Sequence, residues 1–315
     1  MTSSRMSMEI VCFSFNRGRL LLNAIMSARF CCPRAKVTIF DDRSDDRETL
    51  QIIDRLNTQF GVRVLKPELS VSGTRGGLHN NIRAFIERYA TEQIVLLMQD
   101  DTQFFRIIES ADDQSIANFY HARPRSIFLY PMIDRHRFNP NRFEYCEHTQ
   151  TWVRRRDAGY AGYSAVCLVH VERAQANLGV FGESEEQTSS QALKECGPIA
   201  HLPRSFLVYL PAPYTVRGKS DAFISRWWRK KNTGVHPISF LRPEEAEKAF
   251  VNPKVLPNAY DHLVTPSLGH NKGWPAFHLQ GAPRWLWWAD LLEQKFRRSI
   301  QALWHATKIK AIKKC

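Results

Sequence analysis

The chain has 315 residues, a net charge of +13 and a hydrophobic fraction of 43%. That fraction is ordinary for a protein with a sizeable core, so the composition excludes a chain that is disordered throughout. The length predicts one α/β catalytic domain with a smaller C-terminal appendage.

The positive charge is concentrated in two segments. Residues 217–231 carry a net +5 and residues 284–315 a net +6, which together account for +11 of the total. A nucleic-acid-binding protein more often spreads its basic residues over the main face of its core. The near-neutral N-terminal half therefore argues against nucleic acid as a partner.

Seven cysteines are present, an odd number, and no CxxC pair occurs. This pattern excludes a disulfide framework and a cysteine-based zinc site. The N-terminus lacks the apolar region and cleavage site of a signal peptide, and no apolar run is long enough for a transmembrane helix. We therefore expect a cytoplasmic protein.

Strand and helix patterns alternate over the first hundred residues. The apolar runs that predict strands are Glu9–Phe15, Lys36–Phe40, Val62–Leu65 and Ile94–Met98. The amphipathic segments that predict helices are Arg17–Arg29, Asp46–Phe60 and the residues that follow a Gly-rich turn at Ser72–Gly77. This order predicts a mostly parallel sheet with helices on both faces and a ligand site at the carboxyl ends of the strands.

The second half is more mixed. Strands are expected within 126–133, 163–170 and 206–210, with short helices within 172–178 and 183–193 and a long loop or hairpin at 138–157. Five prolines and three glycines in 251–283 predict irregular structure, and 285–307 has the pattern of an amphipathic helix. We expect domains at 1–216 (a nucleotide-binding half, 8–101, and an acceptor half, 102–216), 217–283 and 284–315.

Acidic residues follow two of the predicted strands. Asp100 and Asp101 come directly after Ile94–Met98, where charge is costly unless it is paired or bound to metal. Oxygen ligands of this kind suit Mg²⁺ or Mn²⁺ on a diphosphate, although helix-capping aspartates in a solvated loop would look the same. Asp41 and Asp42 follow the second strand and could accept hydrogen bonds from a base or a ribose.

The order of these segments resembles the family-2 group of GT-A glycosyltransferases, in the nucleotide-diphospho-sugar transferase superfamily. The resemblance covers residues 8–210. The matching segments are Ser14–Arg17 (a YNR-like turn), Phe40–Asp45 (FDDRSD for DDGSxD, with Arg43 for glycine), Gly77 with Arg83 (a glycine-led helix with an inward arginine) and Gln99–Asp101 (a DDD- or DxD-type motif that begins with glutamine).

The resemblance implies a GT-A fold and a site for a nucleotide sugar. Asp101 would be the metal ligand, and Gln99 and Asp100 would face the ribose or the donor sugar. The other positions that it assigns to the nucleotide or donor are Phe15, Asn16, Arg17, Asp41, Asp42 and Arg83.

The acceptor half carries a second set of matches. Residues 159–162 resemble a Gly-rich acceptor floor that ends at Gly162, and 178–183 resemble a glycine-containing turn before an acidic pair. The second acid of that pair is the catalytic base in these enzymes. Glu186 would inherit this role, with Glu185 as its competitor.

We therefore expect an inverting, metal-dependent transfer of a sugar, with UDP as the favoured nucleotide, to a saccharide or lipid-linked saccharide. A nucleotidyltransferase and a non-catalytic nucleotide-sugar-binding module of the same fold are the alternatives. Arg217 and Lys219 could close over the diphosphate, or lie in an acceptor or membrane contact or a solvated loop. The helix at 285–307, with its basic tail, could lie on an anionic membrane surface or dock on the catalytic domain.

Overall fold

The computed structural model describes residues 7–67, 77–132, 143–155, 163–197, 199–210, 234–252, 263–266, 269–270, 288 and 292. The chain divides into two compact units. The first, here called the core unit, contains 1–210 and 237–271, and the second contains 211–236 and 272–315. Almost all described residues belong to the core unit.

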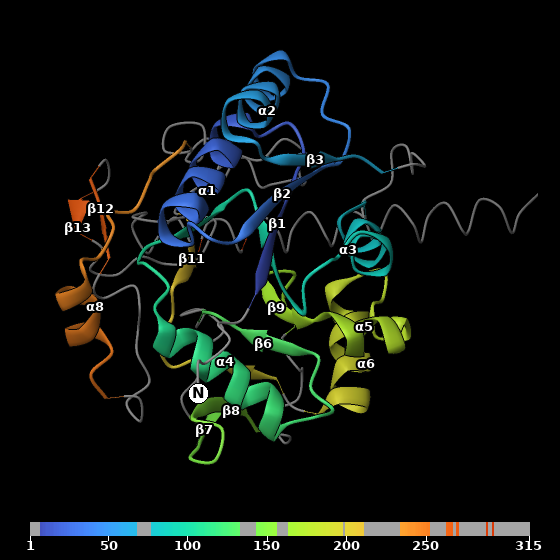
Figure 1. The fold of residues 1–315 in the computed structure, drawn as a ribbon, viewed down its shortest axis with the longest axis vertical. Helices are drawn as coiled ribbons and strands as arrows, with labels where there is room; N and C mark the ends of the chain where they lie inside the picture. Colours follow the sequence, from blue (N-terminus) through green and yellow to red (C-terminus); the bar gives the residue numbers. More distant parts are fainter. Residues whose placement is uncertain are drawn as a thin grey trace, which may run out of the picture. The chain divides into compact units, whose positions relative to one another are not determined.

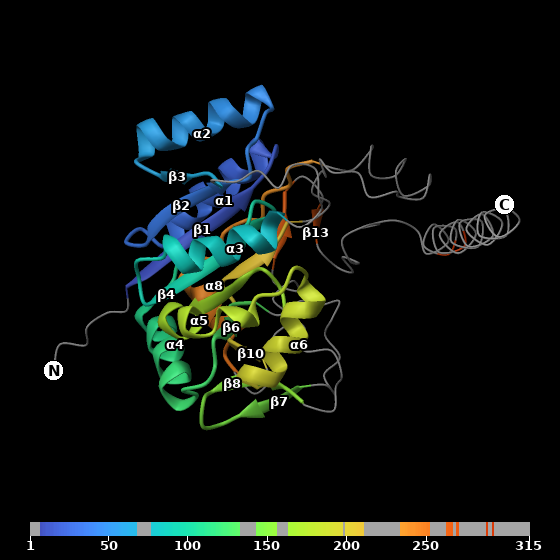
Figure 2. The ribbon, with the colours of Figure 1, turned by 90° about the vertical axis from the view of Figure 1, so that its right-hand side faces the viewer.

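The core unit is built on a nine-stranded sheet with the order β3-β2-β1-β4-β9-β6-β10-β8-β7 among the described residues. Figure 2 shows this order running from β3, beside α2, to β7 at the other end. Strands β9 and β8 run against the direction of the others. The strands are β1 (Met8–Ser14), β2 (Lys36–Asp41), β3 (Arg63–Leu65), β4 (Ile94–Gln99), β6 (Phe128–Tyr130), β7 (Phe143–Cys146), β8 (Thr151–Arg154), β9 (Cys167–His170) and β10 (Ala200–His201).

Two further pairs of strands lie outside the large sheet. They are β5 (Thr102–Phe104) with β11 (Leu207–Tyr209), and β12 (Val264–Thr265) with β13 (Gly269–His270). The helices are α1 (Gly18–Cys31), α2 (Arg47–Phe60), α3 (Gly77–Arg88), α4 (Ser110–Ala122), α5 (Val171–Ala176), the 3-10 helix η3 (Leu178–Val180), α6 (Glu185–Cys196) and α8 (Pro243–Ala249).

Helices cover both faces of the sheet. Side chains alternate along a strand, so Ile10 and Cys12 of β1 join one core cluster whereas Val11 and Phe13 join the other. Residues of α1, α2 and α4 complete the first cluster, and residues of α3, α5 and α6 complete the second. The two groups of helices are separate in Figure 1. A sheet buried on both faces leaves its strand ends as the place where polar side chains gather.

Local sequence sets the geometry of the first helix pair. Asp46 caps α2 by accepting hydrogen bonds from the backbone N–H groups of Glu48 and Thr49, and Gly61 ends the helix at φ 62°. A Cβ atom on Gly18 would lie 2.7 Å from Thr49 Cα, so only glycine permits this approach of α1 to α2. The start of α1 is thereby held beside the start of α2.

The α/β architecture expected from the sequence is confirmed, and each strand and helix predicted within residues 9–101 is present. One difference is that β4 pairs with β9 in antiparallel orientation, although the alternating pattern predicts parallel neighbours. Periodicity fixes which face a strand buries but not the direction of its partner. Elements β5, α4 and α8 were not predicted.

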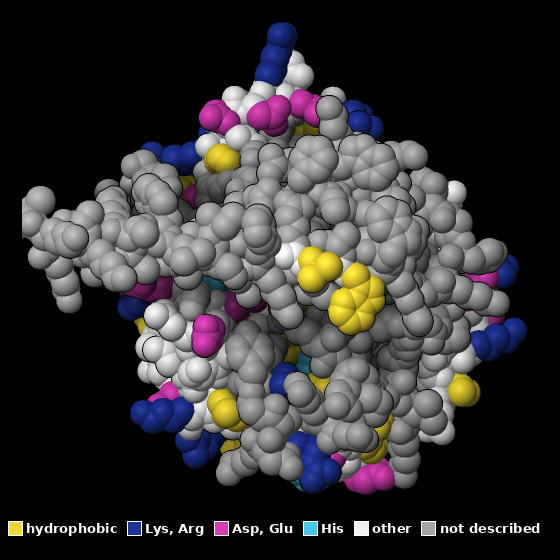
Figure 3. Space-filling model, turned by 180° about the vertical axis from the view of Figure 1, so that it is seen from behind, with side chains coloured by type: hydrophobic (Ala, Val, Ile, Leu, Met, Phe, Trp, Pro, Cys, Tyr) yellow, Lys and Arg dark blue, Asp and Glu magenta, His cyan; other side chains and the backbone are white. Residues whose placement is uncertain are grey.

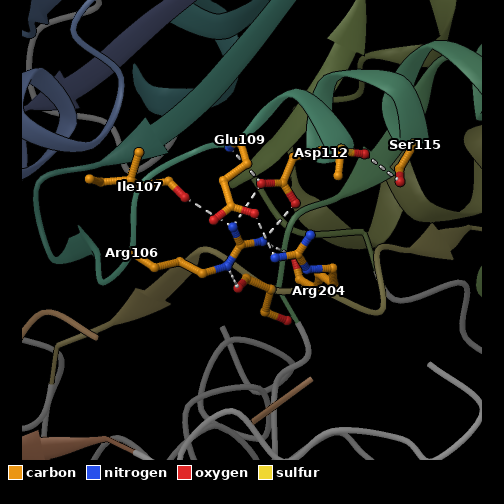
Figure 4. Close-up of polar contacts among 8 residues, drawn as sticks. Arg106, Ile107, Glu109, Asp112, Ser115 and Arg204 are labelled. Atoms are coloured by element: carbon orange, nitrogen blue, oxygen red, sulfur yellow. Dashed lines mark hydrogen bonds and ion pairs between the residues drawn. The ribbon is translucent and has the colours of Figure 1, made fainter. Parts of the chain in front are cut away.

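A buried arginine joins three segments of the core unit (Figure 4). The guanidinium of Arg106 donates to both carboxylate oxygens of Asp112, at 2.7 and 2.8 Å, and both side chains are 2% exposed. It also donates to the carbonyl oxygens of Ser205, Ile107 and Arg204. Every N–H group of this guanidinium is therefore used, which ties the start of α4 to the segment before β11.

Several predictions concern residues that the structure does not describe. The expected domain boundaries at 216 and 283 lie there, as do most of the helix at 285–307 and the basic segment 217–231. The described positions Trp288 and Leu292 are helical and exposed. None of the helices that the structure describes has the length and apolar character needed to span a bilayer. On the face drawn in Figure 3, the described Lys and Arg side chains are scattered rather than gathered in one patch.

Replacing Arg106 by methionine should lower the free energy of unfolding by about 3–5 kcal/mol, because Asp112 would remain buried without its cation. Arg204→Met is the matched control, since its ion pair with Glu109 is partly exposed and should contribute less than about 1 kcal/mol. Urea unfolding followed by circular dichroism measures both. Equal losses of stability in the two variants would contradict this assignment.

Candidate functional site

The loops that follow β1, β2 and β4 meet at one end of the sheet. Strand β1 lies between the other two, with its residues paired to both. The backbone N–H of Asp42 donates to Ser14 O at 2.9 Å, and that of Asp100 donates to Phe13 O at 3.3 Å. Asp42 and Asp101 therefore flank the end of β1, on strands about 10 Å apart.

Asn16 joins the first two of these loops. Its side-chain oxygen accepts from the backbone N–H groups of Asp45 and Asp46, and its backbone N–H donates to Ser44 Oγ. The residue has φ 50°, a left-handed conformation that asparagine tolerates better than most residues. Asn16 thus acts first as a structural clamp between the loops.

Arg43 occupies the position where the family resemblance expects glycine. Its φ of 60° is the left-handed conformation that a glycine would adopt without a steric cost. The turn is therefore kept, at a cost of about 1–2 kcal/mol for a residue with a Cβ atom. Its guanidinium donates to Pro67 O at 3.1 Å.

The two acids after β2 have different surroundings. Asp41, predicted to contact the donor, is fully buried, and its carboxylate accepts hydrogen bonds from the backbone N–H and the hydroxyl of Ser44. Burial raises the pKa of Asp41, and the bonds from Ser44 oppose this shift. Asp42 is half-buried and lies against the start of α3, where a Cβ atom on Gly77 would be 2.5 Å from Asp42 Oδ2. Asp42 is therefore the better placed of the two to meet a ligand.

One guanidinium is shared by the acids that follow β4. Arg17 Nη1 lies 2.7 Å from Asp100 Oδ1, and Arg17 Nη2 lies 3.1 Å from Asp101 Oδ2. The three side chains are between 4% and 16% exposed. Among the described residues, these two carboxyl groups thus share one positive charge in a poorly solvated place, which strengthens every electrostatic interaction there.

Asp100 is held by further donors. Ser14 Oγ donates to Asp100 Oδ2 at 3.0 Å, and the backbone N–H of Phe15 also donates to this carboxylate. Burial raises the pKa of Asp100 to about 7, against the opposing effect of Arg17. The same two carboxylates, together with burial, raise the pKa of the Cys12 thiol beneath them. Asp100 is therefore fixed as part of the floor of the site.

Asp101 retains an unused oxygen. Among the described residues, Asp101 Oδ1 is buried and accepts no hydrogen bond. A buried carboxylate oxygen without a donor is uncommon, and a hard cation is one group that would satisfy it. No group of three acidic, His or Cys side chains that could hold a metal by itself occurs in the part of the chain that the structure describes. The residues fit a metal that takes one carboxylate and completes its shell with phosphate oxygens and water.

The acidic pair at the start of α6 is the second part of the site. Gly182 precedes this pair, and its backbone N–H donates to Thr188 Oγ1. A Cβ atom on Gly182 would lie 2.5 Å from Gln187 Cβ, so a larger residue does not fit there. Glu186 is exposed, whereas Glu185 is half-buried and its charge opposes the lowering of the His79 pKa that burial causes. His79 lies in the first turn of α3, the same turn that begins at Gly77 beside Asp42.

Tyr163 completes this side of the site. Its ring is fully buried, 6.4 Å between centroids from the ring of His79, and its hydroxyl has no hydrogen-bond partner among the described residues. Burial raises the pKa of Tyr163, with the charge of Glu185 adding to this. Neither His79 nor Tyr163 was predicted, because no motif marks them.

Other predicted site residues lie differently. Arg83, expected to point inward, is exposed on α3. Gln99 is the last residue of β4, and its backbone carbonyl accepts a hydrogen bond from Thr102 Oγ1. Its side chain is half-buried. Gly162, Arg217 and Lys219 lie outside the described residues.

No protein-family model and no curated protein matches the sequence. Among solved structures, the chain is similar to the 1–349 fragment of S. aureus TarS, with 17% identity and a TM-score of 0.47 over 65% of this chain and 60% of that one. It is also similar to the mannosyltransferase PcManGT from Pyrobaculum calidifontis in complex with GDP-Man and Mn²⁺ (14%, TM-score 0.42, 63% and 57%). A third is GalNAc-T7 with UDP, GalNAc and Mn²⁺ (15%, TM-score 0.45, 68% and 44%).

These structures are GT-A glycosyltransferases. The matched part of this chain spans less than two thirds of each of the three. At these identities and TM-scores the likeness concerns the fold, so the function has to be argued from the residues of this chain. Membership of family 2 stays a prediction.

Gly77→Ala should displace the Asp42 carboxylate, because the new Cβ atom would lie 2.5 Å from its Oδ2. Gly179→Ala is the control, since a Cβ atom there meets nothing closer than 3.8 Å. Titration calorimetry with UDP should show about tenfold weaker binding for Gly77→Ala, equal to about 1.4 kcal/mol, at an unchanged melting temperature. Equal affinity in both variants would remove Asp42 from the site.

Proposed function

We propose that this chain is an inverting glycosyltransferase that moves a sugar from a nucleoside-diphosphate donor, with UDP favoured, to a saccharide acceptor. The reaction uses a divalent cation, Mg²⁺ or Mn²⁺, at Asp101. The acceptor is a free or lipid-linked saccharide. The support comes from the strand ends of the core unit, where acids from β2 and β4 flank the end of β1.

The observation that carries this proposal is the shared ion pair of Arg17. With both acids ionised, two carboxylates face one guanidinium, and a buried Asp101 oxygen has no donor among the described residues. A bound divalent cation would supply the missing charge and neutralise the diphosphate leaving group. Asp101 would hold the cation, and Asp100 would keep Arg17 in place.

Arg17 has a second consequence for metal binding. Its guanidinium already lies 3.1 Å from the other oxygen of Asp101, so it repels any cation that approaches this carboxylate. A diphosphate would attract the same guanidinium and bring its own oxygens to the cation. We therefore expect the metal to bind weakly alone and tightly together with the nucleotide.

Two further residues would bind the nucleotide and act as the catalytic base. Asp42, beside Gly77, would accept hydrogen bonds from a uracil N–H or a ribose hydroxyl. Glu185, at the start of α6, would take the proton of the acceptor hydroxyl as that oxygen attacks the sugar. Its half-buried position favours it over the exposed Glu186 as the base.

Donor hydrolysis with Mn²⁺ across UDP-, GDP- and other nucleotide sugars tests the overall assignment. Release of the nucleoside diphosphate supports a glycosyltransferase, whereas binding of nucleotide sugar without turnover in the presence of acceptors would favour a non-catalytic module. Release of pyrophosphate from a nucleoside triphosphate and a sugar phosphate would favour a nucleotidyltransferase. The anionic membrane contact of 284–315 stays a prediction, which liposome binding by a chain that lacks this segment would test.

Asp101→Asn should weaken Mn²⁺ binding in the presence of UDP by about tenfold or more, because the proposed ligand loses its charge. Arg17→Met should strengthen Mn²⁺ binding without nucleotide by about tenfold, since the competing cation is gone, yet weaken UDP binding. Arg19→Met is the control, because that side chain is 68% exposed. Electron paramagnetic resonance of free Mn²⁺ measures metal binding by the three variants, and titration calorimetry measures their UDP affinity. Metal binding that is unchanged by Asp101→Asn would contradict the assignment.

Glu185→Gln should lower kcat by about 10²–10⁴, the usual contribution of a general base, at unchanged UDP affinity. Glu186→Gln should leave kcat close to that of the unsubstituted chain, because its side chain is exposed. Initial rates of sugar transfer at saturating donor distinguish the two. The reverse pattern would restore Glu186 as the base that the resemblance implies.

A further inference from the structure

A cavity of about 340 Å³ lies in the core unit beside α4 and the β7–β8 hairpin. Buried apolar side chains of Leu202, Pro203 and Phe250 form part of its wall. Polar side chains of Tyr145, Gln150 and other residues form the remainder. This mixture of an apolar wall with a few polar groups is typical of small-ligand sites.

The wall of the cavity is held rigid by the Arg106 network. Asp112, which lines the cavity, receives both arms of the Arg106 guanidinium, and the carbonyl of Arg204 receives another of its bonds. Figure 4 shows Asp112 and Arg204 beside this guanidinium, with Ser115 further along α4. A ligand would therefore find a preformed surface and would cause little loss of conformational freedom.

The charges around the cavity disfavour an anion. Asp112 is neutralised by Arg106, and Arg204 is paired with Glu109 at 2.8 Å. Glu147, also in the wall, adds a carboxylate. Among the described residues that line the cavity, a phosphate or diphosphate would meet no unbalanced positive charge, so the site suits a neutral ligand with hydroxyl groups.

Gln150 gives the second observation. It ends the turn between β7 and β8 with φ 50°, a conformation that costs a residue with a side chain about 1–2 kcal/mol and that glycine adopts without this cost. Its side chain is exposed and lines the cavity, and its amide makes no hydrogen bond to the described residues, so it is open to a ligand. Strain of this kind is concentrated at functional sites, and an amide can bind two neighbouring hydroxyl groups.

We propose that this cavity binds a neutral saccharide, with a sugar ring against Tyr145 and hydroxyl groups bound by Gln150 and Glu147. Four strand spacings separate β4 from β8, which places the cavity about 19 Å across the sheet from the proposed metal site. The saccharide would be an outer part of the acceptor, and this last step rests on the proposed function. The binding of a saccharide in this cavity does not depend on the proposed function.

The test is ligand-observed NMR with the full chain and the disaccharides maltose, cellobiose, lactose, mannobiose and chitobiose at about 10 mM. At least one should bind. Gln150→Gly should weaken that binding about tenfold while the melting temperature stays equal or rises, because the substitution removes both the amide and the backbone strain. Gln51→Ala, an exposed amide on α2, is the matched control and should change neither property.

Failure to bind any of these sugars, or undiminished binding by Gln150→Gly, would overturn the proposal, as would displacement of the sugar by inorganic phosphate.

The variant Asp101→Asn distinguishes this proposal from the proposed function. It should retain the sugar even if transfer is lost. With active enzyme, Gln150→Gly should raise KM for acceptors longer than a disaccharide and leave kcat unchanged, whereas a purely structural effect would lower kcat as well.

Discussion

The site depends on one guanidinium shared between two carboxyl groups, the buried Asp100 and the partly buried Asp101. Arg17 belongs to the loop after β1, and both acids follow β4, so this ion pair joins the loops of adjacent strands. Removing a single member would leave an uncompensated charge away from water, which is more damaging than never having had the pair. The Asp101 oxygen that accepts no hydrogen bond from a described residue is the basis of the proposed cation site.

The rest of the strand-end region supports this interaction. Asn16 and Ser44 fix the loops after β1 and β2, while Ser14 and the Phe15 backbone hold Asp100. Few of these contacts can be exchanged for others without moving a loop. The start of α3 lies against Asp42, and the charge of Glu185 at the start of α6 acts on His79 in the same turn of α3.

The sequence allowed the first half of the fold to be predicted because each strand there is a short apolar run and each helix has a clear stripe. It also singled out Asp42 and Asp101 as candidate site residues, since acids after buried strands are easily recognised. It could not separate Asp41 from Asp42, because only the fold shows that Ser44 satisfies the former. Arg83 was misplaced for a similar reason, as a spacing does not tell which way a helix turns its side chains. Helix α4 was missed because its polar and small residues give a weak apolar stripe.

Strand β9 has a consequence for how this chain is made. It pairs with β4 on one side and with β6 on the other, although β4 and the first three strands are synthesised much earlier. During translation the N-terminal half can therefore collapse only with an open edge at β4, in addition to the edge at β3 that the finished sheet keeps, until His170 has left the ribosome. Open edges of this kind recruit other chains. Conditions that slow elongation between β4 and β9 should therefore increase aggregation of the nascent protein more than a pause at any later point.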